Sequence, residues 1–271
     1  MSALTKKYID ELDQGVKEIF TSGKWREYLE FLSKFHNYSV NNTIAIFRQR
    51  PDASLVASFT DWRKRGRSVR KGERGIKVIA PHTYIVTDKQ TGEEKQQIGF
   101  HISYCFDVSQ TCGKELPEEP CRALASNVDG YAALRDALIC ISPVPVAYQP
   151  IDSSAYGYYS PAQACIVVKD NLPELQTVKT TIHEIAHAML HGKDCDEEHA
   201  NRHTREVQAE SVAYTVCRYL GLDTSEYSFG YVASWSESQT TDELKVSVEA
   251  IARTADQIIK GIETYRSPNA A

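Results

Sequence analysis

The sequence predicts an α+β protein of two domains, one over residues 1–112 and one over residues 124–271, joined by a linker over residues 113–123. Three observations predict this organisation. Stretches with helical periodicity are separated from β-rich stretches. A segment rich in Pro, Gly and Glu, QTCGKELPEEP, interrupts the chain. The charge also changes, because residues 1–120 hold 19 Lys/Arg against 16 Asp/Glu and the remainder holds 12 against 20.

The first domain begins with helices and continues as a β-hairpin. Between residues 6 and 49 apolar residues recur at helical spacing, as in Tyr28, Leu29, Leu32 and Phe35. Two or three helices fit this stretch. After Pro51 the pattern changes to glycine turns followed by IKVIA and TYIV, then the turn-rich DKQTGEEK and the alternating run IGFHISYCF. Two β-rich runs around a polar turn predict a hairpin.

The second domain combines short strands with long helices. The stretch DGYAALRDALICI predicts a helix, and VPVAY, GYYS and CIVV predict short strands. Residues 175–191 and 203–220 give the two strongest helical patterns in the chain, and a last helix is expected over residues 242–264. Between them the aromatic stretch YSFGYVASWS has no regular period. With 42% hydrophobic residues in 271, the chain has enough apolar side chains for a buried core.

The first residues, MSALTKKYIDEL, lack the apolar core of a signal peptide. No apolar run approaches the roughly 20 residues that a membrane helix needs. The seven cysteines include no Cys-x-x-Cys pair, which favours buried free thiols over disulfides. We therefore expect a cytoplasmic protein that interacts with no membrane.

The run TTIHEIAHAMLHG contains the spacing His-Glu-x-x-His at His183, Glu184 and His187. Residues four apart lie on one face of a helix, so both imidazoles can reach one ion at about 2.1 Å, as tetrahedral Zn²⁺ requires. Glu184 is rotated by roughly 100° from His183, near the metal but not on it. That position suits a general base for an activated water. The pattern predicts a mononuclear zinc site of the metallopeptidase type.

A catalytic zinc of this kind needs a third protein ligand and one open position. The next strong helix, HTREVQAESVAYTVC, offers Glu206 and Glu210 on one face, within a mostly apolar stripe. We assign Glu206 to the metal and Glu210 to a hydrogen bond from a ligand imidazole. The spacing alone does not order the two carboxylates, so the reverse assignment stays open.

A basic block lies between Trp62 and Val78, where one acid, Glu73, accompanies eight basic residues. These are Arg63, Lys64, Arg65, Arg67, Arg70, Lys71, Arg74 and Lys77. Such a block suits phosphate, and aromatic faces for stacked bases would complete a site for single-stranded nucleic acid. Trp62, Tyr38 and Phe59 are the candidate stacking residues. Ordinary core packing for the aromatic residues, and a merely solvated basic hairpin, are the alternatives.

Two stretches resemble a known family. FHNYSVNNTIAIFRQRPDASLVASFTDWRKRGRSVRKGERGIKVIAP, with FDVSQT further on, resembles the N-terminal domain of ArdC-type antirestriction proteins of plasmids and other mobile elements. YYSPAQACIVV, HEIAHAMLH, EVQAESVAY and YVASW resemble the metallopeptidase domain of the same family, which is itself similar to ImmA/IrrE-type peptidases. Together the resemblance covers about residues 8–235.

The resemblance implies single-stranded DNA binding by the first domain, a zincin-like fold in the second, and protection of incoming DNA from host restriction. Its metal site falls on His183, His187 and Glu206, with Glu184 as the base. The chain departs from the pattern at Gln208, where ImmA/IrrE-type proteins often carry a second acid, and in a short acidic loop at 193–198. These departures leave the substrate of any proteolysis undefined.

Three functions therefore compete. The first is a DNA-binding antirestriction protein with a zinc peptidase-type domain. The second is a regulatory metalloprotease that cleaves one protein partner, such as a repressor. The third is a DNA-binding module in which the zinc is purely structural.

Overall fold

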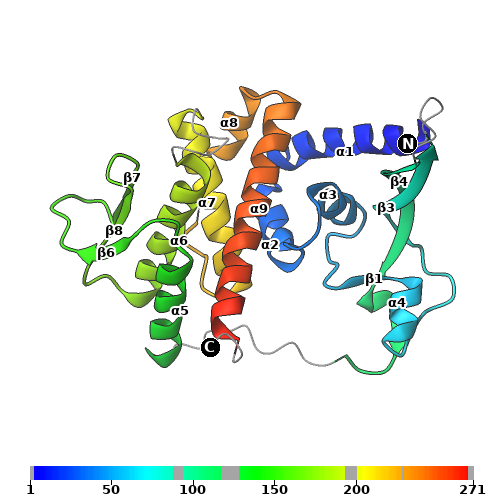
Figure 1. Ribbon diagram of the computed structural model, residues 1–271, viewed down its shortest axis with the longest axis horizontal. Coiled ribbons are helices and arrows are strands. Elements are labelled where there is room, and N and C mark those ends of the chain that lie inside the picture. The colour runs from blue at the N-terminus through cyan, green and yellow to red at the C-terminus, as the bar shows by residue number, and fades with distance from the viewer. Residues whose placement is uncertain (1–2, 88–93, 117–127, 193–199, 228, 268–271) are drawn as a thin grey trace. The chain divides into compact units, whose positions relative to one another are not determined.

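The computed structural model describes residues 3–87, 94–116, 128–192, 200–227 and 229–267. The fold is mixed α and β, as predicted (Figure 1). The chain divides into two compact units. The first unit comprises Met1–Ile19 and Tyr38–Glu118, and the second comprises Phe20–Asn37 and Glu119–Ala271.

This division differs from the expected domain boundary, because residues 20–37 belong to the second unit. The segment contains α2 (Trp25–Lys34). The Trp25 indole donates a hydrogen bond to the Ser211 hydroxyl at 3.1 Å, and Glu30 pairs with Arg218. An amphipathic pattern shows that a helix has an apolar face but not which element covers it. Of the expected linker, residues 117–123 lie outside the described residues.

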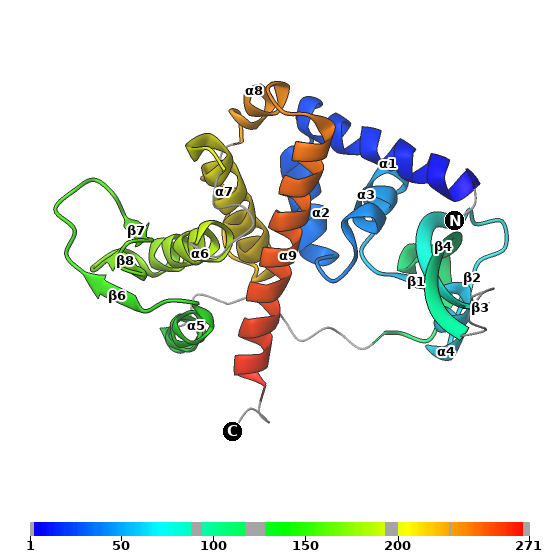
Figure 2. The ribbon, with the colours of Figure 1, turned by 45° about the horizontal axis from the view of Figure 1, so that its top comes forward.

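The first unit is built on a long hairpin. Strands β3 (Ile76–Thr87) and β4 (Glu94–Asp107) are antiparallel, and β1 (Val56–Ser58) pairs with the other edge of β4. The predicted hairpin is therefore present, and it curves strongly in Figure 2. The sequence did not predict the short elements β1, α4 (Phe59–Lys64), β2 (Arg67–Val69), the 3₁₀ turn Val108–Gln110 and β5 (Thr111–Gly113).

Helices α1 (Ala3–Thr21) and α3 (Val40–Gln49) complete the first unit, although the last residues of α1 belong to the second. Two side-chain amides of α3 pair with the outer edge of β3. Asn42 exchanges hydrogen bonds with the backbone N–H and C=O of Ile79, and Gln49 does the same with Lys77. Because the amides satisfy backbone groups that an edge strand leaves unpaired, they fix α3 against the hairpin.

The second unit places helices against a small sheet. Its helices after α2 are α5 (Val128–Ile141), α6 (Glu174–His191), α7 (Arg202–Tyr219), α8 (Val232–Glu237) and α9 (Thr241–Arg266). The strand order is β6 (Val146–Gln149), β8 (Cys165–Lys169), β7 (Gly157–Ser160), with β6 parallel and β7 antiparallel to β8.

Helix α6 packs against β7, β8 and α7, and α7 packs in turn against α2 and α9. Figure 1 shows the sheet beside α6. The central strand β8 is buried at Ile166, Val167 and Val168, as its unbroken apolar run requires. Helix α8 begins within the aromatic stretch YSFGYVASWS, which has no regular period.

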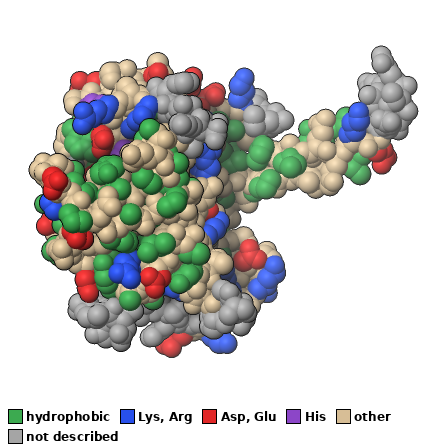
Figure 3. All heavy atoms as spheres, turned by 60° about the vertical axis from the view of Figure 1, so that its left-hand side comes forward, with side chains coloured by type: hydrophobic (Ala, Val, Ile, Leu, Met, Phe, Trp, Pro, Cys, Tyr) green, Lys and Arg blue, Asp and Glu red, His purple; other side chains and the backbone are tan. Residues whose placement is uncertain are grey.

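Figure 3 brings the β6, β7 and β8 side of the molecule forward and shows hydrophobic side chains dispersed among charged and other ones. Tyr156 and Tyr158 are exposed near β7. None of the described helices is long and apolar enough to cross a bilayer. The five described cysteines are free thiols, but Cys112 and Cys140 are exposed, so only part of the expectation of buried thiols holds.

Candidate functional site

Helix α6 carries the His-Glu-x-x-His run in its last three turns. The apolar residues Ile182, Ile185 and Ala186 are completely buried and hold the helix in the core of the second unit. The imidazoles of His183 and His187 therefore occupy a fixed face, as the four-residue spacing predicts. Their Nε2 atoms are 3.0 Å apart.

Helix α7 brings Glu206 to the same point. Its Oε2 atom lies 3.7 Å from Nε2 of His183 and 3.7 Å from Nε2 of His187. The centre of this triangle is about 2 Å from each of the three atoms, which matches zinc–nitrogen and zinc–oxygen bond lengths. These residues form the one group of metal-type ligands found among the described residues. Two imidazoles and a carboxylate fit a divalent cation.

Glu210 lies one turn beyond Glu206 and on the other side of the first imidazole. Its Oε2 atom is 3.5 Å from Nδ1 of His183, the ring nitrogen that faces away from the triangle. A carboxylate there orients a ligand imidazole and favours the tautomer with a free Nε2. The structure thus separates the two carboxylates, with Glu206 beside both Nε2 atoms and Glu210 beside Nδ1.

The electrostatics of the cluster keep Glu206 ionised. Hydrogen bonds to His183 and His187 hold the pKa of Glu206 far below its usual range. Burial lowers the pKa of His183, but Glu206, Glu184 and Glu210 together raise it above its ordinary value. Three carboxylates around two imidazoles concentrate negative charge, which favours a bound cation.

Glu184 lies beside β7 and close to the two imidazoles. Its side chain is buried, and a hydrogen bond from the Tyr159 backbone contacts it. Burial raises its pKa above the usual value of a carboxyl group. Gly157 lies close by, since a Cβ atom there would be 3.4 Å from Cγ of Glu184. A carboxylate with a raised pKa beside the metal-type ligands suits a proton acceptor.

Two cavities open onto the cluster, and His183, Glu184 and Gly157 line both. The smaller, of about 350 Å³, also contacts Lys179 and Glu210. The larger, of about 740 Å³, extends past His187 to the start of α7. A ligand can therefore approach the cluster along β7 from two sides.

The sequence interpretation missed the cations around the cluster. Lys179 is buried, lies 3.4 Å from Glu226 and has its ammonium 5.4 Å from the centre of the Tyr227 ring. It precedes His183 by four residues, so the spacing that indicated His187 also places Lys179 on that face. Arg202 and Arg205 line the larger cavity.

Gln208, the position at which the sequence departs from ImmA/IrrE-type proteins, is buried and donates to Ser247 at 3.1 Å. The acidic loop at 193–198 lies outside the described residues.

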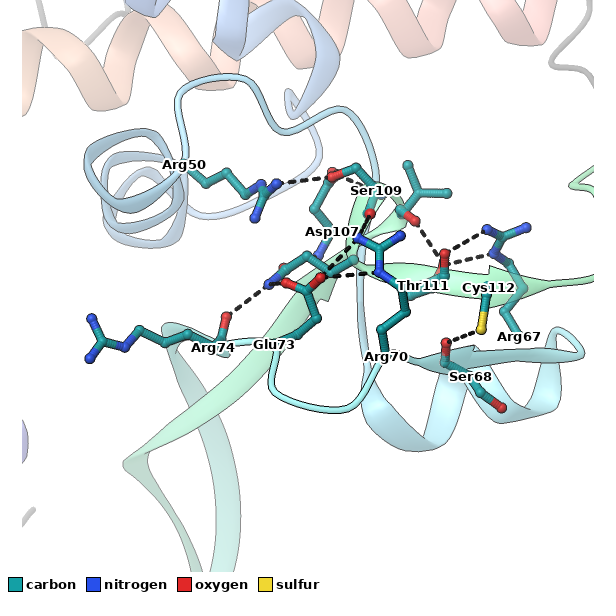
Figure 4. Close-up of polar contacts among 12 residues, drawn as sticks. Arg50, Arg67, Ser68, Arg70, Glu73, Arg74, Asp107, Ser109, Thr111 and Cys112 are labelled. Atoms are coloured by element: carbon teal, nitrogen blue, oxygen red, sulfur yellow. Dashed lines mark hydrogen bonds and ion pairs between the residues drawn. The ribbon is translucent and has the colours of Figure 1, made fainter.

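In the first unit, the structure uses part of the basic block internally. Trp62 is 0% exposed and donates its indole hydrogen to the Phe106 carbonyl at 2.7 Å, so it belongs to the core and offers no face to a base. Arg67 donates to the Thr111 hydroxyl and Arg70 pairs with Glu73, as Figure 4 shows. The burial of Trp62 corrects its prediction as a stacking residue. Arg67 and Arg70 have partners within the fold, and their contact with DNA stays a prediction.

The other predicted DNA-binding residues differ in exposure. Tyr38 is half-buried and donates its hydroxyl to the Val56 carbonyl at 3.0 Å. Lys64 is exposed but pairs with Asp61 at 3.0 Å, and the Arg65 guanidinium lies 5.6 Å from the centre of the Trp62 ring. The remaining members of the block are exposed; they are Arg63, Lys71, Arg74 and Lys77. Phe59 is also exposed.

Two family models match the chain one after the other. Residues 1–106 match the N-terminal domain of the anti-restriction factor ArdC. Residues 143–256 match an IrrE N-terminal-like domain of peptidase type. The second match contains all the residues of the cluster.

Similar proteins were found by sequence and by structure. An uncharacterized protein of Bacillus anthracis is 28% identical over 310 residues, covering 96% of this chain and 51% of the relative, so the chain spans about half of that protein. The metal-free crystal structure of ArdC from the R388 plasmid has a TM-score of 0.56 at 21% identity, over 85% of this chain and 87% of that one. The Mn(II)-bound structure of ArdC from R388 has a TM-score of 0.60 at 18% identity, over 94% and 97%. The two domain matches in this order show that the chain carries a domain like the N-terminal domain of ArdC, followed by an IrrE-like domain of peptidase type.

Proposed function

We propose that this chain binds single-stranded DNA through its first unit and carries, in its second unit, a divalent metal centre of the peptidase type that holds zinc. The observation that carries the proposal is the convergence of His183, His187 and Glu206 beside Glu184. Two imidazoles and one carboxylate are the ligand set of several catalytic zinc sites. The Mn(II)-bound R388 structure supports a divalent ion in general.

The residues of the cluster would divide the work. A divalent ion held by His183, His187 and Glu206 supplies Lewis-acid activation of a water and of a peptide carbonyl. Glu184 accepts the proton of the attacking water and passes it to the leaving amine nitrogen, a task that its raised pKa favours. Glu210 accepts a hydrogen bond from Nδ1 of His183 and keeps the ring in register.

The openness of the site supports a peptidase-type centre over a purely structural zinc. Structural zinc sites are closed by four protein ligands, whereas catalytic sites keep an open position. Here the described residues supply three ligands, the Glu206 side chain is 49% exposed, and two cavities reach the cluster. This arrangement leaves room for a water and a peptide.

Substitution of Glu184 tests the hydrolytic part. Glu184→Gln keeps the size of the side chain and removes its basicity, so the variant should retain its zinc and lose activity. The activity to measure is the protection of unmodified plasmid DNA that enters a restricting host. If Glu184→Gln protects as well as the unchanged chain, hydrolysis is not needed and the chain acts as a binding module. A protein that is cleaved only by the unchanged chain would instead favour the regulatory protease.

The DNA-binding part rests on the match to the ArdC N-terminal domain and on the exposed cations of the first unit. Fluorescence anisotropy with a labelled single-stranded oligonucleotide should show binding that weakens as salt rises from 50 to 200 mM, because phosphate contacts release counterions. Absence of binding, or tighter binding to a duplex of the same length, would contradict this part.

A further inference from the structure

A cleft of about 870 Å³ lies within the first unit. Of the basic residues of the basic block, only Arg74 and Lys77 line it. Residues of α1, α3, β3 and β4 line it, together with the turn before β3. Its volume falls within the range of roughly 300–1,000 Å³ that is usual for ligand sites. It gathers both cations and aromatic rings.

The cations come from two stretches of the chain. Arg48 lies in the last turn of α3 and Arg50 follows that helix, whereas Arg74 precedes β3 and Lys77 lies in it. In Figure 4 the Arg74 side chain extends away from the hydrogen-bonded cluster around Glu73. Glu73 is the acid that lines the cleft, and its carboxylate is paired with Arg70. The lining is therefore net positive.

Some of these cations have partners at the surface. Arg48 pairs with Glu18 at 3.2 Å and donates to the Glu11 carbonyl at 2.9 Å, and both of these contacts are exposed. Arg50 donates to the Ser109 hydroxyl at 3.1 Å. Exposed ion pairs contribute little free energy, so a phosphate can compete for the guanidinium of Arg48.

Tyr104 supplies an exposed ring at the cleft. It stands directly opposite Lys77 in the β3–β4 register, so the two side chains project from the same face of the hairpin. The ring is 52% exposed. A Cβ atom at Gly75 would be 3.1 Å from Cδ1 of Tyr104, so the absence of a side chain at Gly75 leaves room for the half-exposed ring.

Hydrogen bonds to the backbone of Lys77 join three of the elements that line the cleft. The Lys77 carbonyl accepts from the Tyr8 hydroxyl at 3.0 Å and from the Gln49 amide at 2.9 Å. The Gln49 amide oxygen accepts from the Lys77 N–H at 2.9 Å. Because α1, α3 and β3 are joined at this one residue, the cations and the ring keep a fixed spacing before any ligand arrives.

We propose that this cleft is the site at which the first unit holds single-stranded DNA, with a base stacked on Tyr104 and phosphates met by Arg74, Lys77 and Arg48. The inference rests on the proposed DNA-binding function and gives it a place. Stacking on a protein ring needs a base whose face is free, which a single strand offers and a paired helix does not. Trp62 and Arg67 do not line the cleft, and Arg70 contacts it only through its ion pair with Glu73.

Anisotropy with a fluorescein-labelled oligothymidylate tests the stacking ring. Tyr104→Leu should weaken binding about 5- to 150-fold, because one base–aromatic stack is lost. Tyr84→Leu is the matched control, since Tyr84 is an exposed tyrosine of the same hairpin and does not line the cleft. It should bind as the unchanged chain does. Circular dichroism should show that both variants remain folded.

The cations are tested by the salt dependence of the same binding. Arg74→Gln with Lys77→Gln should lower the slope of log affinity against log salt by about 1.4, because each lost phosphate contact on a single strand contributes about 0.7. Lys95→Gln with Lys114→Gln removes the same charge at two exposed positions of the first unit that lie outside both the cleft and the basic block, and should leave the slope nearly unchanged.

The outcomes separate the inference from the function on which it rests. If the unchanged chain binds and the cleft variants bind equally well, or the control pair loses more, the cleft is overturned and DNA binding stands. If the unchanged chain does not bind single-stranded DNA, both are overturned.

Discussion

The contact between β7 and α6 tests how β7 positions Glu184, the proposed general base. A Cβ atom at Gly157 would lie 2.6 Å from Cγ2 of Thr180 and 3.0 Å from the Val167 carbonyl oxygen. The first distance is far shorter than real contacts of this kind, and the second is at their limit. Gly157→Ala must therefore displace β7 from α6 or distort the strand.

The size of the effect follows from these distances. The Thr180 methyl would have to retreat by about 0.8 Å to reach an ordinary 3.4 Å contact. Overpacking of this kind costs about 1–3 kcal/mol in the free energy of unfolding. Because Glu184 is also beside Gly157, a shift of this size would misplace the base, and misplacement by about 1 Å can cost 100-fold in rate. Urea unfolding measures the free energy of unfolding, and metal analysis measures the zinc content. Protection of incoming DNA measures the activity.

A second substitution makes the reasoning specific. Thr180→Ser removes the contacting methyl and keeps the hydroxyl that accepts from the Gln176 amide at 3.1 Å. Added to Gly157→Ala, it should restore part of the lost stability, whereas the Val167 contact remains. Gly230→Ala is the control, since a Cβ there meets nothing within 4 Å. The reasoning is refuted if Gly157→Ala unfolds within about 0.5 kcal/mol of the unchanged chain, or if Thr180→Ser recovers nothing.

Three further predictions concern the core, the acid stability and the metal. Trp62→Phe should lower the free energy of unfolding by about 1–3 kcal/mol, because the buried Phe106 carbonyl loses its donor, yet leave DNA affinity unchanged; a large loss of affinity in the folded variant would restore Trp62 as a stacking residue. Burial raises the pKa of Asp107, but hydrogen bonds from Ser109, Ser54 and Leu55 lower it more, so the net pKa lies below its usual value. Its stabilisation should be full above about pH 4 and fade as pH falls through the folded pKa, so the stability gap between Asp107→Asn and the unchanged chain, measured in urea, should shrink with acid; a gap that grows with acid would contradict this sign. A chelator should lower the unfolding temperature, and zinc at 100 times its dissociation constant should restore about 2.7 kcal/mol; equal melting curves with and without the chelator would contradict a metal that stabilises the fold.

The long elements of the fold could be predicted because their patterns repeat over many residues. The helices that carry His183 and Glu206 and the β3–β4 hairpin are of this kind. The short elements β1, α4, β2 and β5 have three to six residues, too few for a period to be visible. The membership of α2 in the second unit depends on a partner more than 180 residues away, as the Trp25–Ser211 hydrogen bond shows. No local pattern contains that information.

In the candidate site, too, the local spacing could be predicted and the contacts between helices could not. The spacing of His183 and His187 is a property of any helix, so the sequence alone predicts their shared face. The placement of Glu206 beside the Nε2 atoms and of Glu210 beside Nδ1 depends on how two helices cross, which the spacing left open. The sequence shows which residues of the basic block are charged, but it does not show which of them pair with other parts of the fold. Arg67 and Arg70 are paired by loops that meet only in the folded unit.

Metal analysis of the purified protein by mass spectrometry tests the central claim most directly. The unchanged chain and Glu184→Gln should each contain about one zinc per chain, because Glu184 holds no ion, whereas His183→Ala and Glu206→Ala should lose it. A chain that binds no divalent metal, or a Glu206→Ala variant that keeps a full complement, would contradict the account.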